Sequence, residues 1–189
     1  MKLNKLLALV LAVVMVMSLI PAAMAETEVS LDFEDGNAGF VAVYEGMANS
    51  ASATLEVVPY NGSNAMKVTN GNGKVPYIAF DVLSLLGEKA ADVASVEMTM
   101  GIENPDGKFY ACSGEMKLFT GGSLSKMARA WSVYMEKKNP KVAVFEMGEE
   151  AFSEDAPLMV VTLSVDNGSA KCAAPAVLYV DDVRFLDAE

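Results

Sequence analysis

The side chains that could carry chemistry in this chain are mainly carboxylates and tyrosines, because its 189 residues include no histidine. Without imidazole, the chain lacks the commonest general base and the commonest transition-metal ligand. Paired carboxylates can still cleave a glycosidic bond. Glu97 stands two residues before Thr99 and Glu115 two residues before Lys117, but no E-x-D-x-x-E segment puts three acids on one face. Because no motif with a known catalytic mechanism is present, an enzyme that cleaves glycosidic bonds is less favoured than a protein without catalytic activity.

Two tyrosines are expected to lie on solvated strand faces. Tyr134 shares a strand face with Ser132, and Tyr77 lies opposite the apolar Ile78. Trp131, the only tryptophan, falls in phase with the apolar residues of its strand and is expected in the core. The ring available to a ligand on this strand is then that of Tyr134.

The elements that must position these residues are strands, since period-two alternation is broken throughout by clusters of Gly, Asn, Asp and Pro. This rhythm is typical of an all-β sandwich or barrel with about ten strands. One short helix is expected from Leu83 to Asp92. The predicted strands are Val29 to Phe33, Phe40 to Tyr44, Ala53 to Pro59, Ala65 to Asn70, Pro76 to Leu83, Val93 to Glu103, Lys108 to Phe119, Ala128 to Glu136, Lys141 to Met147, Leu158 to Val165 and Val177 to Leu186.

The segment from Met1 to Ala25 has the pattern of a cleavable signal peptide. Two lysines precede an apolar run from Leu6 to Ile20, and an A-x-A site ends at Ala25. A retained anchor is the alternative, but the run is shorter than the roughly 20 residues that span a bilayer. We expect a secreted protein with one domain, Glu26 to Glu189, and no membrane contact after cleavage.

The chain is acidic, with a formal net charge of −11. Such a field opposes binding to nucleic acid and to anionic membrane surfaces, so neither is expected as a partner. Cys112 and Cys172 could form a disulfide in an oxidising compartment. Cys112 also fits a free thiol packed among apolar residues, and the sequence leaves both alternatives open.

Three segments, in chain order, resemble the jelly-roll carbohydrate-binding modules of the galactose-binding-like superfamily. They are Leu31-Asp32-Phe33-Glu34-Asp35-Gly36, Gly62-Ser63-Asn64-Ala65-Met66-Lys67-Val68-Thr69 and Leu178-Tyr179-Val180-Asp181-Asp182-Val183-Arg184-Phe185. The resemblance implies a two-sheet antiparallel β-sandwich, with about ten strands and one short helix, that recognises glycans without catalysis.

The resemblance also implies a structural calcium ion between the first and last strands, held by Glu34 and Asp181. Calcium binds carboxylate and carbonyl oxygens. Asp181 is expected on the apolar face shared by Val183 and Phe185, where an ionised carboxylate is costly unless a cation or hydrogen bonds compensate it. The alternative is that Asp181 caps a turn and that Glu34 is an ordinary exposed acid.

In modules of this kind, aromatic rings lie flat against the sugar while polar side chains bond its hydroxyls. The resemblance therefore assigns polysaccharide or oligosaccharide binding to a wet groove formed by Tyr134, Tyr77, Glu97, Glu115 and Lys117. A solvated sheet face without a ligand is the alternative for these residues. For the whole protein, the second hypothesis is an extracellular surface or matrix module that binds a protein partner, which a contiguous exposed apolar patch would favour.

Overall fold

The computed structural model describes residues 29–36, 41–42, 53–70, 77–103, 112–121, 126–135, 140–165 and 176–187. The predicted signal peptide and Cys172 lie outside these residues, so the cleavage and the disulfide remain predictions. Within the described ranges, no helix has the length and apolar character needed to cross a membrane.

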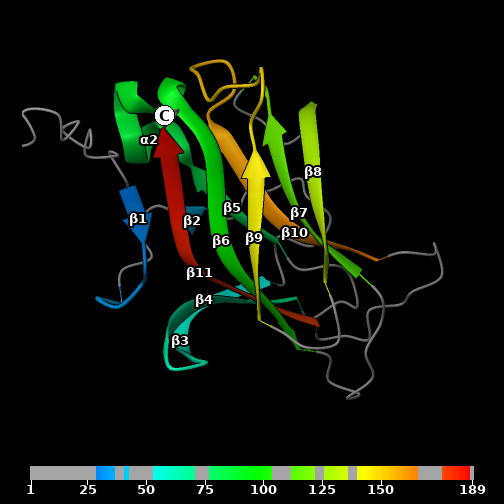
Figure 1. The fold of residues 1–189 in the computed structure, drawn as a ribbon. Coiled ribbons are helices and arrows are strands. Elements are labelled where there is room, and N and C mark those ends of the chain that lie inside the picture. The colour runs from blue at the N-terminus through cyan, green and yellow to red at the C-terminus, as the bar shows by residue number, and fades with distance from the viewer. Residues whose placement is uncertain are drawn as a thin grey trace, which may run out of the picture.

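The strands form two antiparallel sheets that pack face to face (Figure 1). The six-stranded sheet has the order β3-β4-β11-β6-β9, with β1 also paired to β11; it contains β1 (Val29–Leu31), β3 (Ala53–Tyr60), β4 (Ser63–Asn70), β6 (Val93–Glu103), β9 (Lys141–Glu146) and β11 (Ala176–Asp187). The five-stranded sheet has the order β2-β5-β10-β7-β8; it contains β2 (Val41–Ala42), β5 (Tyr77–Asp81), β7 (Cys112–Phe119), β8 (Met127–Met135) and β10 (Leu158–Val165). This architecture confirms the predicted two-sheet sandwich.

Apolar side chains at alternate strand positions fill the space between the sheets. Met98 and Met100 of β6 are fully buried, as are Met116 of β7 and Met159 of β10 in the other sheet. Methionine is unbranched and adapts to irregular gaps between two twisted sheets. Each fully buried apolar side chain contributes about 1.5 to 3 kcal/mol to the stability of the folded state. These core positions are the ones at which the sequence alternation predicts apolar residues.

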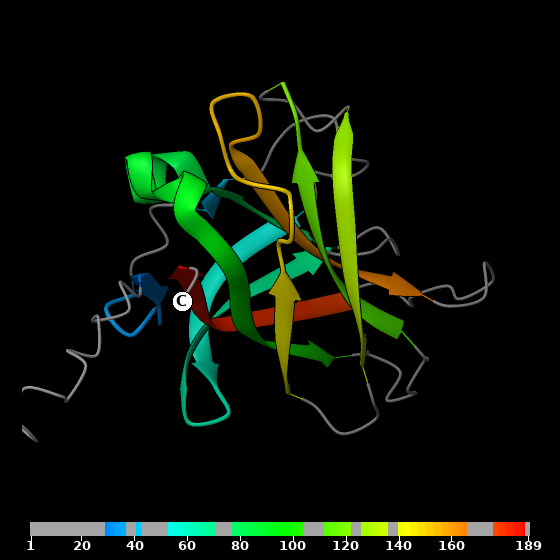
Figure 2. The same ribbon diagram turned by 45° about the horizontal axis from the view of Figure 1, so that its top comes forward.

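One end of the sandwich is closed by α2 (Val82–Leu86) and the 3₁₀ helix η2 (Gly87–Asp92), which confirms the predicted short helix. The Asp81 carboxylate caps α2 by accepting from the Ser84 N–H at 2.9 Å. Gly87 ends it with a positive φ of 59°. The turned view in Figure 2 shows these helices at the same end as the connection from β9 to β10.

The β3–β4 hairpin turns at Asn61 and Gly62, whose φ values are 52° and 100°. Positive φ at both central residues is the geometry in which an Asn-Gly turn matches the strand twist. The hairpin places Ser63 at the start of β4, next to Asp181 of β11. A local turn thus joins a segment near the start of the domain to its last strand.

The prediction that Asp181 shares the apolar face of Val183 is wrong, because β11 contains a bulge. The register with β6 shifts between Asp181 and Arg184, and Asp182 has a φ of 48°. The extra residue changes the phase of the strand, so Val180 and Val183 both enter the core. Asp181 pairs with Thr99 of β6, and Thr99 pairs in turn with the exposed Val142 of β9. Because directly paired residues share a side of the sheet, Asp181 lies on the outer side.

Candidate functional site

The outer face of the five-stranded sheet gathers polar residues from neighbouring strands. Thr162 of β10 pairs with Glu115 of β7, which in turn pairs with Ser132 of β8. On its other side, Thr162 pairs with Tyr77 of β5, of which the structure describes the backbone register. Residues paired directly across strands share a side of the sheet. These four positions therefore form one row across the sheet.

The rows above and below continue this surface. Ser113 pairs with Tyr134, and Lys117 pairs with Ala130. Successive rows on one side of a sheet are two residues apart, or about 7 Å. Tyr134, Glu115 and Lys117 thus occupy three consecutive rows. We refer to the outer surface of these rows as the five-stranded face; it comprises Tyr77, Ser113, Glu115, Lys117, Ala130, Ser132, Tyr134 and Thr162.

A half-buried ion pair lies at the centre of the five-stranded face. The Lys117 Nζ atom is 2.7 Å from Glu115 Oε2, and the two side chains are 26% and 16% exposed. A pair sheltered to this degree is screened less by salt than one in open solvent. It presents cationic donors beside carboxylate acceptors, which suits a hydroxyl group that both donates and accepts.

Tyr134 and Trp131 point to opposite sides of β8. Tyr134 is 50% exposed on the five-stranded face. Trp131 packs against the core, which confirms its prediction, and the guanidinium of Arg129 lies 5.3 Å from its ring centre. Lys141 Nζ donates to the carbonyl oxygen of Tyr134 at 2.8 Å and so ties β8 to β9. Of these two rings, that of Tyr134 is the one a ligand can reach.

The rest of this outer surface is apolar and closed. Ala79, Phe119, Leu158 and Val160 form a separate buried cluster beyond Lys117, and Thr162 is also buried. The part of the surface that a ligand can reach is therefore centred on β7 and β8. Ser132 is exposed beside Tyr134 and belongs to this part. It is not among the predicted carbohydrate-contacting residues, although its alternation with Tyr134 in the sequence indicates the same face.

Glu97, the remaining predicted carbohydrate-contacting residue, is not part of the five-stranded face. It lies on β6 in the other sheet, where Arg184 Nη1 donates to its Oε1 atom at 3.0 Å. The structure thus brings Tyr134, Glu115 and Lys117 to one surface, with the backbone position of Tyr77 in the same row as Glu115, and places Glu97 on the opposite surface. The alternation of polar residues could not distinguish the two sheets.

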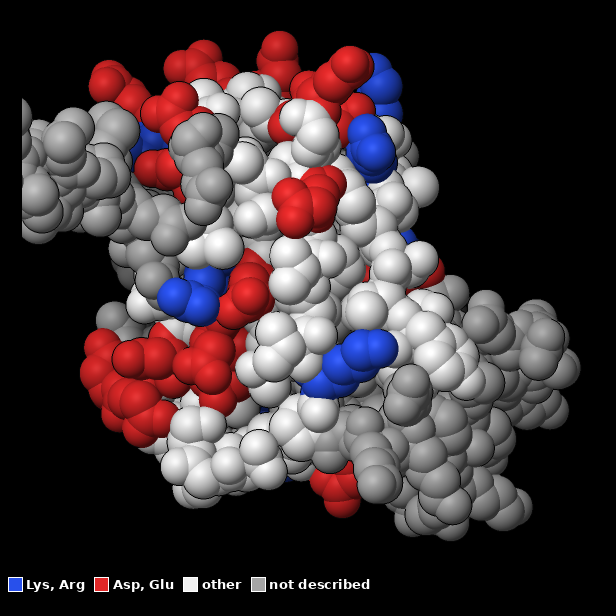
Figure 3. Space-filling view, in the orientation of Figure 1, with Lys and Arg blue, Asp and Glu red and all other residues white. Residues whose placement is uncertain are grey.

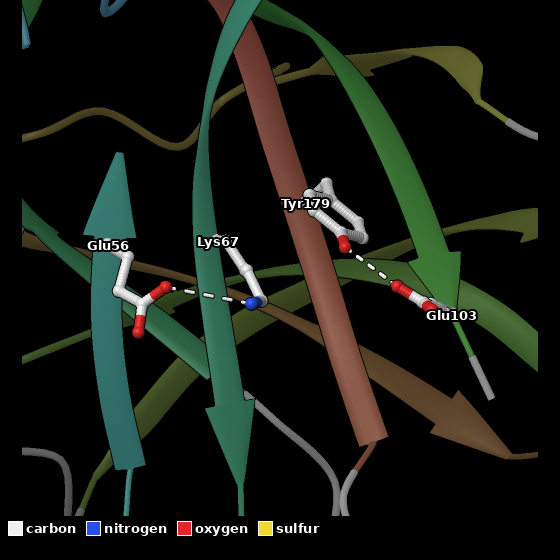
Figure 4. A network of polar contacts seen from close by, with 4 residues as sticks. All are labelled: Glu56, Lys67, Glu103 and Tyr179. Carbon is white, nitrogen blue, oxygen red and sulfur yellow. Dashed lines mark hydrogen bonds and ion pairs between the residues drawn. The ribbon is translucent and has the colours of Figure 1, made fainter. Parts of the chain in front are cut away.

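The outer surface of the six-stranded sheet carries two aromatic rings in contact with each other. Tyr60 and Tyr179 stack with 4.0 Å between ring centres and 7° between planes. The Tyr179 hydroxyl donates to Glu103 Oε2 at 2.7 Å, and Lys67 lies 3.6 Å from Glu56 alongside (Figure 4). We refer to this surface as the six-stranded face; it comprises Glu56, Tyr60, Lys67, Glu97, Gly101, Glu103, Val142, Val144, Tyr179, Asp181 and Arg184.

The two stacked tyrosines are held in place by packing and charge. Burial raises the pKa of both hydroxyls, and the negative charge of Glu103 raises them further. Gly101 leaves room for the Tyr60 ring, because a Cβ atom at this position would collide with the ring and its hydroxyl. Tyr179 is buried and Tyr60 is partly buried against it, so this pair presents less free ring surface than Tyr134 does.

The residues predicted to hold calcium meet where β1, β11 and the β3–β4 hairpin join. Glu34 Oε1 accepts from the Asn64 N–H at 2.7 Å. Asp181 accepts from the Ser63 hydroxyl at 2.5 Å and from the Asp182 N–H at 2.8 Å. These bonds show that Asp181 stabilises the local turn.

The carboxylates of Glu34 and Asp181 indicate whether this region could bind calcium. Asp181 is 3% exposed. Burial raises its pKa, and the nearby Asp182 and Glu34 add to that effect, while the Ser63 hydroxyl and the Asp182 N–H oppose it. A cation would relieve the buried charge, and carboxylate oxygens suit calcium. The described residues contain no group of three or more acidic, Cys or His side chains arranged to hold a metal ion, so Glu34 and Asp181 would need backbone carbonyls or water as further ligands.

No protein-family model matches the chain, and no curated protein matches its sequence. Solved structures do match its fold. The CBM22-2 xylan-binding domain of Xyn10C from Paenibacillus barcinonensis matches with a TM-score of 0.55 at 16% identity, covering 85% of this chain and 99% of that domain.

Two further modules give the same result. CBM28, a module specific for non-crystalline cellulose, matches with a TM-score of 0.52 at 16% identity, covering 82% of this chain and 90% of that one. The family 11 module of the cellulosomal cellulase Lic26A-Cel5E of Clostridium thermocellum matches with a TM-score of 0.51 at 12% identity, covering 85% and 95%. The chain therefore has the jelly-roll β-sandwich fold of the CBM22, CBM28 and CBM11 carbohydrate-binding modules.

Proposed function

We propose that the protein is a secreted, non-catalytic module that binds polysaccharide or oligosaccharide through the five-stranded face, around β7 and β8. The observation that carries the proposal is the exposed ring of Tyr134, one row from the Glu115–Lys117 ion pair. A ring of this kind can lie flat against a sugar while the ion pair bonds its hydroxyls. The similar folds include modules described as specific for xylan and for non-crystalline cellulose, which supports this ligand class.

The spacing of carboxylates on this side of the sandwich favours binding over catalysis. Glu115 engages Lys117, and Asp81, at the far end of β5, caps α2. Glu115 lies in the same row of the sheet as Tyr77. Asp81 is four residues farther along β5 than Tyr77, so its backbone is about 13 Å from that row. Glycosidase carboxyl pairs are about 5 to 9.5 Å apart. Among the described residues of this surface, both acids are therefore already engaged and their backbone positions lie farther apart than such carboxyl pairs, which favours binding over that chemistry.

Export is part of the proposal and rests on the sequence from Met1 to Ala25. N-terminal sequencing of the exported protein should begin at Glu26. Recovery of an intact Met1 from the membrane fraction would contradict it.

Calcium enters the proposal as a structural ion held by Glu34 and Asp181. When bound, such an ion supplies positive charge to a buried carboxylate and links oxygens from separate strands. The residues around it already connect β1, the hairpin and β11 through their own hydrogen bonds. We expect the ion to stabilise the fold without contacting the sugar.

A glycan array probed with residues 26–189, with added calcium and separately with chelator, tests the function. Binding to at least one polysaccharide or oligosaccharide on the array, in both conditions, is the expected result. No binding to any glycan in calcium, by a protein that melts cooperatively, would contradict the proposed function.

A further inference from the structure

A cavity of about 460 Å³ opens at the helical end of the sandwich, away from the five-stranded face. Its apolar wall is formed by Leu83 of α2, Ala91 of η2 and Phe152 of the β9–β10 connection. Glu88 and Glu154 complete the lining and are exposed to solvent. The volume is within the range of small-ligand sites and can hold one large side chain.

The floor of the cavity is fixed by the core. Phe152 is fully buried and meets Phe185 of β11 edge to face, with 6.4 Å between ring centres. The Val82 N–H donates to the Pro157 carbonyl at 3.0 Å and joins the helix to the connection. Buried rings and backbone bonds therefore hold the two walls in place.

The mouth of the cavity is negatively charged. Among the residues that the structure describes, neither Glu88 nor Glu154 pairs with a lysine or arginine. Figure 3 shows further acidic residues gathered along this end of the molecule. A cationic group next to an apolar one would gain both burial on the wall and attraction to the rim.

We propose that this cavity binds a partner protein segment in which an apolar side chain is flanked by lysine or arginine. The apolar side chain occupies the space against Phe152, and the basic neighbours pair with Glu88 and Glu154. Because the cavity is at the end of the sandwich, the partner and a glycan on the five-stranded face do not compete. The acidic rim excludes acidic segments by like-charge repulsion.

The test uses residues 26–189 and three capped tripeptides, Lys-Phe-Lys, Lys-Ala-Lys and Glu-Phe-Glu, followed by NMR. Lys-Phe-Lys is expected to shift the methyl signals of Leu83 and Ala91, with an affinity that falls as salt rises. Lys-Ala-Lys should bind at least tenfold more weakly, and Glu-Phe-Glu should not bind. Equal shifts from Glu-Phe-Glu, or none from Lys-Phe-Lys, would overturn the proposal.

Two variants test the site itself. Ala91 is exposed on η2, so Ala91→Phe should fold while filling the cavity and abolishing the Leu83 shift. Glu88→Gln with Glu154→Gln should weaken Lys-Phe-Lys binding at least fivefold and remove most of its salt dependence. The matched control is Glu149→Gln, an exposed acid at the same end that does not line the cavity, which should bind as the wild type does. Unchanged binding in the double variant would overturn the proposal even if Ala91→Phe failed to fold.

Discussion

The two outer faces of the sandwich both carry tyrosine, carboxylate and lysine, but they use them differently. On the six-stranded face, Tyr179 is covered by Tyr60 and bonded to Glu103. On the five-stranded face, half of the Tyr134 surface is open to solvent. Residue types alone make the two faces look equivalent, and the difference comes from which rings are already in contact.

This difference separates a structural surface from a binding surface. A ring that is stacked and hydrogen-bonded has already given up its contact with water, so a ligand gains little by covering it. An exposed ring beside a fixed ion pair retains that gain. We therefore expect changes on the six-stranded face to alter stability and changes on the five-stranded face to alter binding.

The largest effect is expected from truncating the exposed ring. Tyr134→Ala should weaken glycan binding by about 2 kcal/mol or more, which is roughly 30-fold. The free energy of unfolding should change by less than about 0.5 kcal/mol, because the ring is largely exposed. Calorimetric titration with the glycan found on the array, together with chemical denaturation, measures both.

Tyr60→Ala is the matched control on the other face. It removes a stacked ring and should lower the free energy of unfolding by about 1 to 3 kcal/mol while leaving glycan affinity unchanged. If Tyr60→Ala lost binding and Tyr134→Ala kept it, the assignment of the two faces would be reversed.

Local pattern predicted the strands better than it predicted the site. The ends of the strands Val93–Glu103 and Leu158–Val165 agree with the structure, because alternation and turn residues are local signals. Glu97 was grouped with Glu115 because both stand at polar positions of alternating strands. The partner that assigns Glu97 to the other face, Arg184, is 87 residues away, and no local pattern encodes that pairing.

The position of Asp181 was missed for a different reason. The bulge depends on Asp182 adopting a positive φ, which aspartate tolerates better than most residues but does not require. An uninterrupted alternation was therefore the simplest interpretation of β11, and it gave the wrong side for Asp181. The contact between Asp181 and the β3–β4 hairpin follows from the fold and the bulge together.

Calcium should give an effect of similar size, but on stability, by binding to Glu34 and Asp181 on the side of the molecule that holds the six-stranded sheet. At about 100 times its Kd, an ion that binds only the native state adds about 2.7 kcal/mol to the free energy of unfolding. Asp181→Asn keeps an acceptor for Ser63 but removes the charge, so it should lose most of this increment. Thermal melts with calcium and with chelator measure it; a wild type whose melt is the same in both would rule out the ion.

A smaller effect is expected from filling the space beneath the stacked rings. Gly101→Ala should destabilise the protein by about 1 to 3 kcal/mol, because the added methyl collides with Tyr60. In the Tyr60→Ala background the same change should cost nothing, since the colliding ring is absent. Denaturation of the two single variants and the double variant gives the coupling energy. Equal costs in both backgrounds would show that Gly101 serves some other purpose than making room for the ring.

The smallest effect is a pH dependence that comes from Asp181. Burial raises the pKa of this carboxyl above its ordinary value of 3.8, so in chelator the folded state binds a proton more tightly than the unfolded state does. Stability should therefore rise as the pH falls through the raised pKa of the folded state toward the ordinary value of 3.8, and Asp181→Asn should lack this component. Calcium competes with the proton for the carboxylate and should reverse the trend in the wild type. Denaturation across this pH range, with and without calcium, measures the difference. If the wild type and Asp181→Asn showed the same pH dependence in chelator, burial would not disfavour the ionised form of Asp181. A cation beside it would then have no buried charge to stabilise, and the calcium proposal would lose its support.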